Sequence, residues 1–307
     1  MHEEHVEFFS EGIRVAGLLR LPDTASAAAP VPAVVQGPGW LGLADAKAYM
    51  PWHTALVEAG YGVLAFDYRG HGRSEGERGW ILPSRMVEDV INAVTYLETR
   101  PEIASDRIGA FGIGATGAGN AIVAAAADPR IRCVAVQSVI ADGALWLRRM
   151  RSEPEWIEYR RRVAEDARTW VTTGVSELVD PRAEIMVAAP ERANYTGKKD
   201  VDAKMEAQFH LQSAAAVMRY RPIDVVDRIA PRALLLVSVA DDAVTPDEHA
   251  TALFERAGSP KRLVRQHGTT HYESYTQNFE LLSREFVAWY DRHLGPLTVE
   301  TFDGEPG

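Results

Sequence analysis

The chain has a single cysteine, no excess of positive charge and no long apolar run. Cys133 alone cannot form an internal disulfide, and its apolar surroundings predict a buried strand position. The formal net charge of −10 argues against a nucleic-acid-binding protein, because such proteins cluster Lys and Arg against phosphates. No stretch approaches the roughly 18 apolar residues of a membrane span, and the start of the chain has no apolar signal segment. We therefore expect a cytoplasmic protein that binds neither nucleic acid nor membrane.

Signatures of metals and cofactors are equally scarce. The histidines are scattered, and one cysteine leaves no C-x-x-C pair. The phosphate-loop pattern G-x-x-x-x-G-K-[ST] does not occur. We expect no metal and no cofactor, and a small-molecule substrate as the main partner.

Short apolar runs and amphipathic segments alternate along most of the chain. Two runs on either side of Ser10-Glu11-Gly12 predict a β-hairpin. Predicted strands at 33–36, 62–67, 107–112, 131–137, 233–239 and 262–266 alternate with predicted helices at 48–59, 86–97, 118–127, 246–257 and 278–293. This alternation is typical of a parallel sheet with helices on both faces. The sequence therefore predicts an α/β protein with a doubly wound, mostly parallel sheet.

One segment of different character interrupts this pattern. Residues 143–220 contain no convincing strand and are rich in Arg, Glu and Trp, which predicts a mostly helical insertion. Its charges are expected to pair along solvated helix faces, and its apolar residues to cover the sheet edge where ligands bind. We expect residues 1–142 and 221–295 to form the two parts of one core, 143–220 to form a lid, and 296–307 to form a C-terminal tail.

The glycine-rich run at residues 112–119 lies between a predicted strand and a predicted helix. In a nucleophile elbow, G-x-S-x-G, the flanking residues are small because strand and helix approach closely, and the central side chain is exposed. Here the central residue is Gly114. The run also matches the dinucleotide pattern G-x-G-x-x-G, but it follows a strand late in the order and lacks the expected acidic ribose partner. We favour the elbow, and Thr116 lies too far round the turn to replace a serine at 114.

Further motifs together resemble the dienelactone-hydrolase-like branch of the α/β-hydrolase superfamily. They are Asp67–Gly76 (DYRGHGRSEG), Val87–Val90 (VEDV), Thr99–Glu102 (TRPE), Asp106–Gly109 (DRIG) and Tyr220–Pro222 (YRP). The resemblance extends along nearly the whole chain and is weakest in the insertion. It implies an α/β-hydrolase fold and, by analogy alone, a homodimer. That branch carries Ser or Cys where this chain has Gly114, so the resemblance indicates architecture better than substrate.

The resemblance also implies a catalytic acid and base. Asp242 follows a predicted strand at the place from which the family's acid orients a histidine, with Asp241 as the close alternative. His271 lies in a loop after the next strand, and the order of nucleophile position, acid and histidine agrees with this fold. His267 is the weaker candidate for the base, and His53 is expected to be structural.

An oxyanion hole needs backbone N–H groups at fixed positions. Ala115, directly after the elbow position, is expected to supply one of them. Trp40, in the loop after the first parallel strand, is expected to supply the other because Pro38 cannot donate. The Trp40 ring is also expected to form an apolar wall of the pocket or to pack against the lid, and these two roles are compatible.

Without a serine at position 114, three classes of function stay open. The first, which we favour, is a hydrolase of an ester, thioester, lactone or carbon–carbon bond in a small to medium apolar carbonyl substrate. In it Gly114 either replaces an original serine or is native, with His271 activating water. The second is a non-hydrolytic lyase, cyclase or acyl-processing enzyme of secondary metabolism that uses the His–Asp dyad as general base. The third is a ligand-binding pseudoenzyme.

Overall fold

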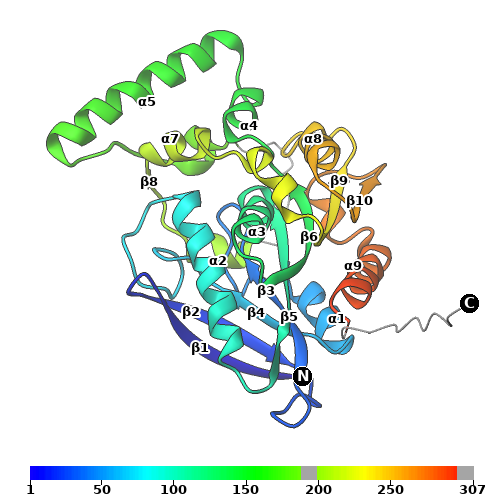
Figure 1. The fold of residues 1–307 in the computed structure, drawn as a ribbon. Coiled ribbons are helices and arrows are strands. Elements are labelled where there is room, and N and C mark those ends of the chain that lie inside the picture. The colour runs from blue at the N-terminus through cyan, green and yellow to red at the C-terminus, as the bar shows by residue number, and fades with distance from the viewer. Residues whose placement is uncertain (188–198, 296–307) are drawn as a thin grey trace, which may run out of the picture.

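The computed structural model describes residues 1–187 and 199–295. Its centre is an eight-stranded sheet with the order β1-β2-β4-β3-β5-β6-β9-β10 (Figure 1). The strands are β1 (His2–Ser10), β2 (Ile13–Leu21), β3 (Val31–Gly37), β4 (Gly62–Phe66), β5 (Ile103–Gly114), β6 (Ile131–Val139), β9 (Ala233–Val239) and β10 (Lys261–Gln266). Strand β2 is antiparallel to β1 and β4, and the other pairs are parallel. The predicted hairpin and the predicted mostly parallel sheet are confirmed.

Helices cover both faces of this sheet. On one face lie α1 (Met50–Glu58) and α9 (Phe279–His293), where Trp52 packs against Phe111 of β5 and Phe286 of α9. The other face carries α2 (Pro83–Glu98), α3 (Ala115–Ala127) and α8 (Glu248–Arg256). Because both faces are covered, the central strands are mostly buried, and their buried stretches are nearly continuous apolar runs.

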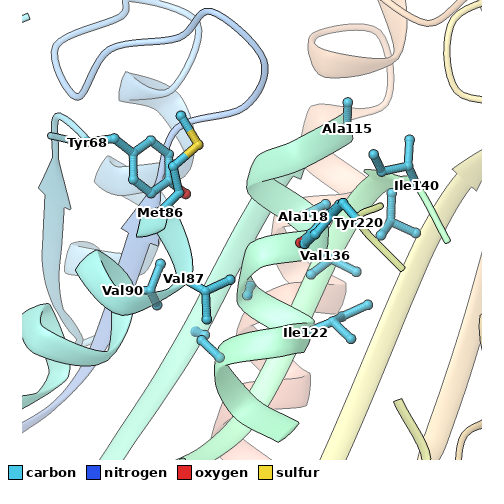
Figure 2. Packing of buried hydrophobic residues seen from close by; sticks show 14 of the residues in the cluster. Tyr68, Met86, Val87, Val90, Ala115, Ala118, Ile122, Val136, Ile140 and Tyr220 are labelled. Carbon is cyan, nitrogen blue, oxygen red and sulfur yellow. The ribbon is translucent and has the colours of Figure 1, made fainter. Parts of the chain in front are cut away.

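Helix α3 connects the sheet to the candidate elbow. Figure 2 shows Ala115 and Ala118 along α3, with Val87 of α2 on one side and Val136 of β6 on the other. The helix begins at Ala115, three residues earlier than the predicted start, because β5 continues through Gly114 and turns directly into it. The turn therefore has no linker, as an elbow requires.

Between β6 and β9 the chain forms a largely helical segment. It contains α4 (Gly143–Arg149), α5 (Glu153–Thr173), the π-helix η1 (Pro181–Ile185), α6 (Lys199–Asp202) and α7 (Gln212–Met218). Helix α5 extends away from the sheet beyond α4 and α7 (Figure 1). The expectation of no strand here is wrong: β7 (Leu178–Val179) pairs with β8 (Phe209–His210). Strands of two residues are too short to leave an alternation in the sequence.

The boundaries of α5 follow from its local sequence. Ser152 and Glu155 form a capping box at its start, and Gly174, with a φ of 77°, ends it. On the exposed side of the helix, Arg161 pairs with Glu158 and also with Glu165 at i,i+4 spacing. The predicted pairing along solvated helix faces is confirmed at these residues.

The motifs that carry the family resemblance contribute to the scaffold. Arg69 binds the fully buried carboxylate of Asp89 at 2.6 Å. Asp67, at the end of β4, accepts hydrogen bonds from the backbone N–H groups of Ala44 and Arg73. These contacts hold the loops after β3 and β4 against α2, and the first of those loops contributes to the candidate site.

Two side chains expected to be structural are buried. Cys133 has no exposure within β6, and burial raises the pKa of its thiol. His53 of α1 is also buried, with Arg20 donating to its Nδ1 at 2.8 Å and Gln36 bonded to its Nε2. Burial, helped by the positive charge of Arg20, lowers the pKa of His53 to about 3. His53 is therefore a neutral core residue at physiological pH.

Candidate active site

The carboxyl ends of four parallel strands meet at one small cavity of about 30 Å³. Strand β5 ends there, and the loops after β3, β9 and β10 supply the other walls. The lining residues are Trp40, Leu41, Gly114, Ala115, Arg182, Met186, Val244, His271, Tyr272 and Tyr275. Four of the five residues predicted for the site line this cavity, and the fifth, Asp242, is bonded to one of them. A space of this size holds about one or two water molecules.

Asp242 and His271 lie together as a buried pair. His271 Nδ1 is 2.8 Å from Asp242 Oδ2. Asp242 also accepts hydrogen bonds from the N–H groups of Val244 and Thr245 and from the Thr245 hydroxyl, at 2.7, 3.0 and 2.9 Å. Burial raises the pKa of Asp242, but His271 and the other donors outweigh it and the pKa is lowered. Asp242 is thus a carboxylate, which assigns the imidazole proton to Nδ1 and leaves Nε2 as an acceptor.

The alternative acid and base lie elsewhere. Asp241 and His267 line a separate pocket of about 350 Å³ between the loops after β9 and β10, and neither lines the small cavity. His271 lies between the two spaces and lines both. Thr116 is buried in the first turn of α3 and is not part of the cavity wall. Of the candidate acids and bases, the structure brings together Asp242 and His271.

The turn at Gly114 is closely packed on its flanks and open at its centre. A Cβ on Gly112 would lie 2.5 Å from the Cα of Ala118, so no larger residue fits there. Gly114 has a φ of 76°, in the left-handed region that favours glycine. A Cβ on Gly114 would nevertheless meet no atom nearer than the Tyr275 hydroxyl at 3.4 Å, an ordinary contact. The backbone favours glycine at position 114, but the space admits a small side chain.

The hydroxyl of Tyr275 lies between Gly114 and the imidazole of His271. It is 3.0 Å from His271 Nε2, and the phenol donates because Nε2 is the acceptor. Tyr275 is the last residue of the short 3-10 helix η5 (Glu273–Tyr275). Its ring stands edge-on to the imidazole of His271, with ring centroids 5.4 Å apart. The sequence analysis did not identify Tyr275. The one signal for it in the sequence was its position four residues after His271, in the segment H-Y-E-S-Y, because side chains at that spacing can meet on one side of a helical turn.

A second set of hydrogen bonds holds the His271 loop. The Ser274 hydroxyl donates to the carbonyl oxygen of His271 at 2.7 Å, and the side-chain amide of Gln137 donates to the Ser274 hydroxyl at 3.1 Å. Gln137 belongs to β6, so the loop is tied to the centre of the sheet. This support restricts the orientation of the imidazole.

The two predicted oxyanion donors lie at the cavity wall. Ala115 is the first residue of α3, so its amide has no acceptor within the helix. The neighbouring amide of Gly39 donates to the Tyr49 hydroxyl at 3.1 Å and is therefore already bonded. The Trp40 ring packs edge-on against Trp146 of α4, with centroids 5.5 Å apart. Trp40 is therefore both a cavity wall and a contact with the helical segment, as predicted.

The helical segment also contributes to the cavity wall. Arg182 of η1 and Met186, which follows it, complete the wall. Sequence reasoning had not named either residue for the site. With both in place the cavity is too small for a substrate of several heavy atoms. The cavity is therefore much smaller than the usual ligand pocket of roughly 300–1,000 Å³.

The arrangement can move a proton and stabilise a negative oxygen. A phenol, an imidazole and a buried carboxylate lie in hydrogen-bond sequence, next to two candidate N–H donors. Within residues 1–187 and 199–295, no group of three or more His, Cys, Asp or Glu could hold a metal ion. No helix in that part of the chain is long and apolar enough to cross a membrane.

A doubly wound sheet with an elbow after β5, an acid after β9 and a histidine after β10 is the α/β-hydrolase fold. The family model described as serine aminopeptidase, S33, matches residues 42–273, and the chain belongs to this family.

Individual relatives cover most of the chain at low identity. An uncharacterised 31.7 kDa protein of Escherichia coli is 27% identical over 242 residues, 78% of this chain and 84% of that protein. The thiohydrolase aneE of Aspergillus aculeatus is 25% identical over 280 residues, 87% and 86% of the two chains. The polyketide transferase claH of Penicillium crustosum is 26% identical over 255 residues, which cover 78% of this chain and 80% of that protein. The structure of the hypothetical protein PA2218 of Pseudomonas aeruginosa has a TM-score of 0.81 at 20% identity, covering 95% of this chain and 94% of that one, which shows the shared fold.

Proposed function

We propose that this protein hydrolyses an ester, thioester or related acyl bond of a small to medium apolar carbonyl substrate. The observation that carries the proposal is the buried Asp242–His271 pair beside a small cavity at the carboxyl edge of the sheet. Trp40 and Met186 supply apolar wall for an acyl group. The sequence resemblance to the dienelactone-hydrolase-like branch and the thiohydrolase relative support the same class of substrate.

Gly114 supplies no nucleophile, so the attacking group in this proposal is water. The Asp242–His271 dyad accepts the water proton, and the water oxygen bonds to the carbonyl carbon. The amides of Ala115 and Trp40 then stabilise the oxyanion. Serine triads that lose the nucleophile keep about 10³ to 10⁴ of acceleration over water from the oxyanion hole and binding alone. In this proposal, general-base catalysis by the dyad adds to that residual rate, so turnover should be slow but measurable. The helical segment, through Arg182 and Met186, acts as a lid that limits the water in the site.

The proposal is tested with p-nitrophenyl esters and N-acetylcysteamine thioesters of short and medium acyl chains. His271→Ala should lower kcat/KM by about 10²- to 10⁴-fold, the range for loss of a general base. His267→Ala is the matched control, because His267 lies in the same loop but outside the small cavity, and it should keep the wild-type rate. Equal rates for the wild type and His271→Ala would refute the proposal.

Acyl transfer is the second candidate, favoured by the polyketide transferase relative and by a cavity with room for so little water. The same dyad would then deprotonate an acceptor hydroxyl or thiol instead of water. Mass spectrometry of products formed with an added alcohol or thiol separates the two reactions. An acyl group found on the acceptor would indicate transfer, whereas free acid alone would indicate hydrolysis.

A further inference from the structure

Tyr275 carries a buried hydroxyl that the scheme above does not use. It donates to His271 Nε2 at 3.0 Å and is 3.4 Å from the position of a Cβ on Gly114. The residue is 5% exposed and lines the cavity. The nitrogen expected to activate water is therefore already bonded, and the oxygen between it and Gly114 belongs to Tyr275.

We propose that Tyr275 is a catalytic residue that relays a proton between the attacking water and His271. The inference rests on the proposed hydrolysis and deepens it, because it names the group in contact with the reacting water. Asp242, His271 and Tyr275 are joined by bonds of 2.8 and 3.0 Å, within the reach that links acid, base and hydroxyl in nucleophilic triads. Tyr275 thus presents an activated hydroxyl where the resembling family has a serine or cysteine.

Glycine at 114 and tyrosine at 275 are complementary in this arrangement. The phenolic oxygen is in ordinary contact with the space that a Cβ would fill. A hydroxyl attached to that Cβ would compete with the phenol for the same imidazole nitrogen. The absence of a side chain at 114 therefore leaves room for the phenol and for a water molecule beside it.

The relay is balanced in both steps. In the attack, the phenolic proton moves to Nε2 of His271 while the phenolic oxygen takes a proton from water, and the water oxygen bonds to the carbonyl carbon. The carbonyl electron pair moves to its oxygen, held by the two backbone donors. In the collapse, the C–O or C–S bond breaks, the leaving group takes a proton from Tyr275, and Tyr275 regains one from Nε2. One water is consumed, and one acid and one alcohol or thiol are released.

The first test is Tyr275→Phe, which removes the hydroxyl and keeps the ring. With the esters and thioesters named above, kcat should fall about 100-fold or more, while KM stays within about twofold because the apolar wall is kept. Tyr96→Phe is the control, since it removes a hydroxyl on α2, away from the cavity, that accepts a hydrogen bond from Arg100 at 3.0 Å. It should leave kcat unchanged. A Tyr275→Phe protein with wild-type kcat would overturn the relay while the proposed hydrolysis stood.

A second measurement separates the relay from the proposed function. Methanesulfonyl fluoride should sulfonylate Tyr275 in the wild type, and His271→Ala should slow this labelling, because His271 draws the proton from the phenol. Labelling without turnover of any ester would refute hydrolysis but support the activated hydroxyl. Absence of both would overturn both proposals. An acyl group found on Tyr275 in acid-quenched reactions would also overturn the relay, because Tyr275 would then be a nucleophile.

Discussion

Tyr275→Phe should have opposite effects on activity according to the residue at position 114. In the Gly114 protein the proposed relay passes through the phenol, so its loss should lower kcat. In a Gly114→Ser protein the serine needs the same imidazole nitrogen of His271, so loss of the phenol raises kcat. The four proteins made by combining the two substitutions form a double-mutant cycle.

The size of the reversal follows from the geometry. A serine Cβ fits at 3.4 Å from the Tyr275 hydroxyl, and the left-handed backbone at position 114 costs an L-residue about 1–2 kcal/mol, which the fold can absorb. A neutral hydrogen bond contributes about 0.5–1.5 kcal/mol. Displacement of the phenol from His271 therefore costs the serine about 2- to 13-fold in activity. Tyr275→Phe should therefore raise kcat about 2- to 13-fold in the Gly114→Ser protein and lower kcat about 100-fold in the Gly114 protein.

The assay is steady-state hydrolysis of a short p-nitrophenyl ester, with intact mass after exposure to a serine-directed phosphonate. The Gly114→Ser protein should be labelled, and its Tyr275→Phe derivative should be labelled faster. Thermal unfolding of all four proteins controls for misfolding. If Tyr275→Phe lowered kcat by the same factor in both backgrounds, Tyr275 would be a supporting residue and our reasoning would be refuted.

Three further predictions concern the oxyanion loop, the acid and the core. Gly39→Ala should lower kcat about 100-fold, because the new Cβ would lie 2.4 Å from a backbone oxygen of β5 and displace the loop. Gly12→Ala is the control, because its Cβ would meet no atom within 4 Å, and it should keep the original kcat. Equal losses of kcat in the two variants would contradict the prediction. Thr245→Val removes a 2.9 Å donor to the Asp242 carboxylate and should lower kcat about 10-fold, measured with the same esters; an unchanged kcat would show that this donor is not needed. The folded-state pKa of His53, about 3, is depressed from 6.5, so its contribution to stability is complete above pH 6.5 and declines as the pH falls toward 3. In urea unfolding, His53 should lower the free energy of unfolding by about 2 kcal/mol between pH 8 and pH 5. The His53→Gln protein should lose less stability over the same pH range, by about that amount.

The fold could be predicted from sequence because it leaves local patterns, whereas the candidate acid and histidine were predicted from the resemblance to a known family. Strands buried on both faces are continuous apolar runs, helices between them have one apolar side, and a tight strand-to-helix turn demands small flanking residues such as Gly112. The order of Gly114, Asp242 and His271 along the chain then matched the order of elements in the sheet. Each of these signals lies within a few residues of the feature it predicts.

Tertiary packing alone decided which of the polar groups meet. Asp241 and Asp242 are adjacent in sequence and line the same neighbouring pocket, yet it is the Asp242 carboxylate that bonds to His271. Tyr275 reaches the imidazole, and Arg182 closes the cavity from a segment more than sixty residues beyond the elbow. The periodicity of apolar residues indicates which side of one element is buried. A cavity built from the end of β5 and the loops after three other strands depends instead on how distant elements pack against one another. The sequence by itself determined the sheet and the small-residue turn at Gly114, whereas the pairing of Asp242 with His271, the small cavity and the phenol beside Gly114 exist only in the folded chain.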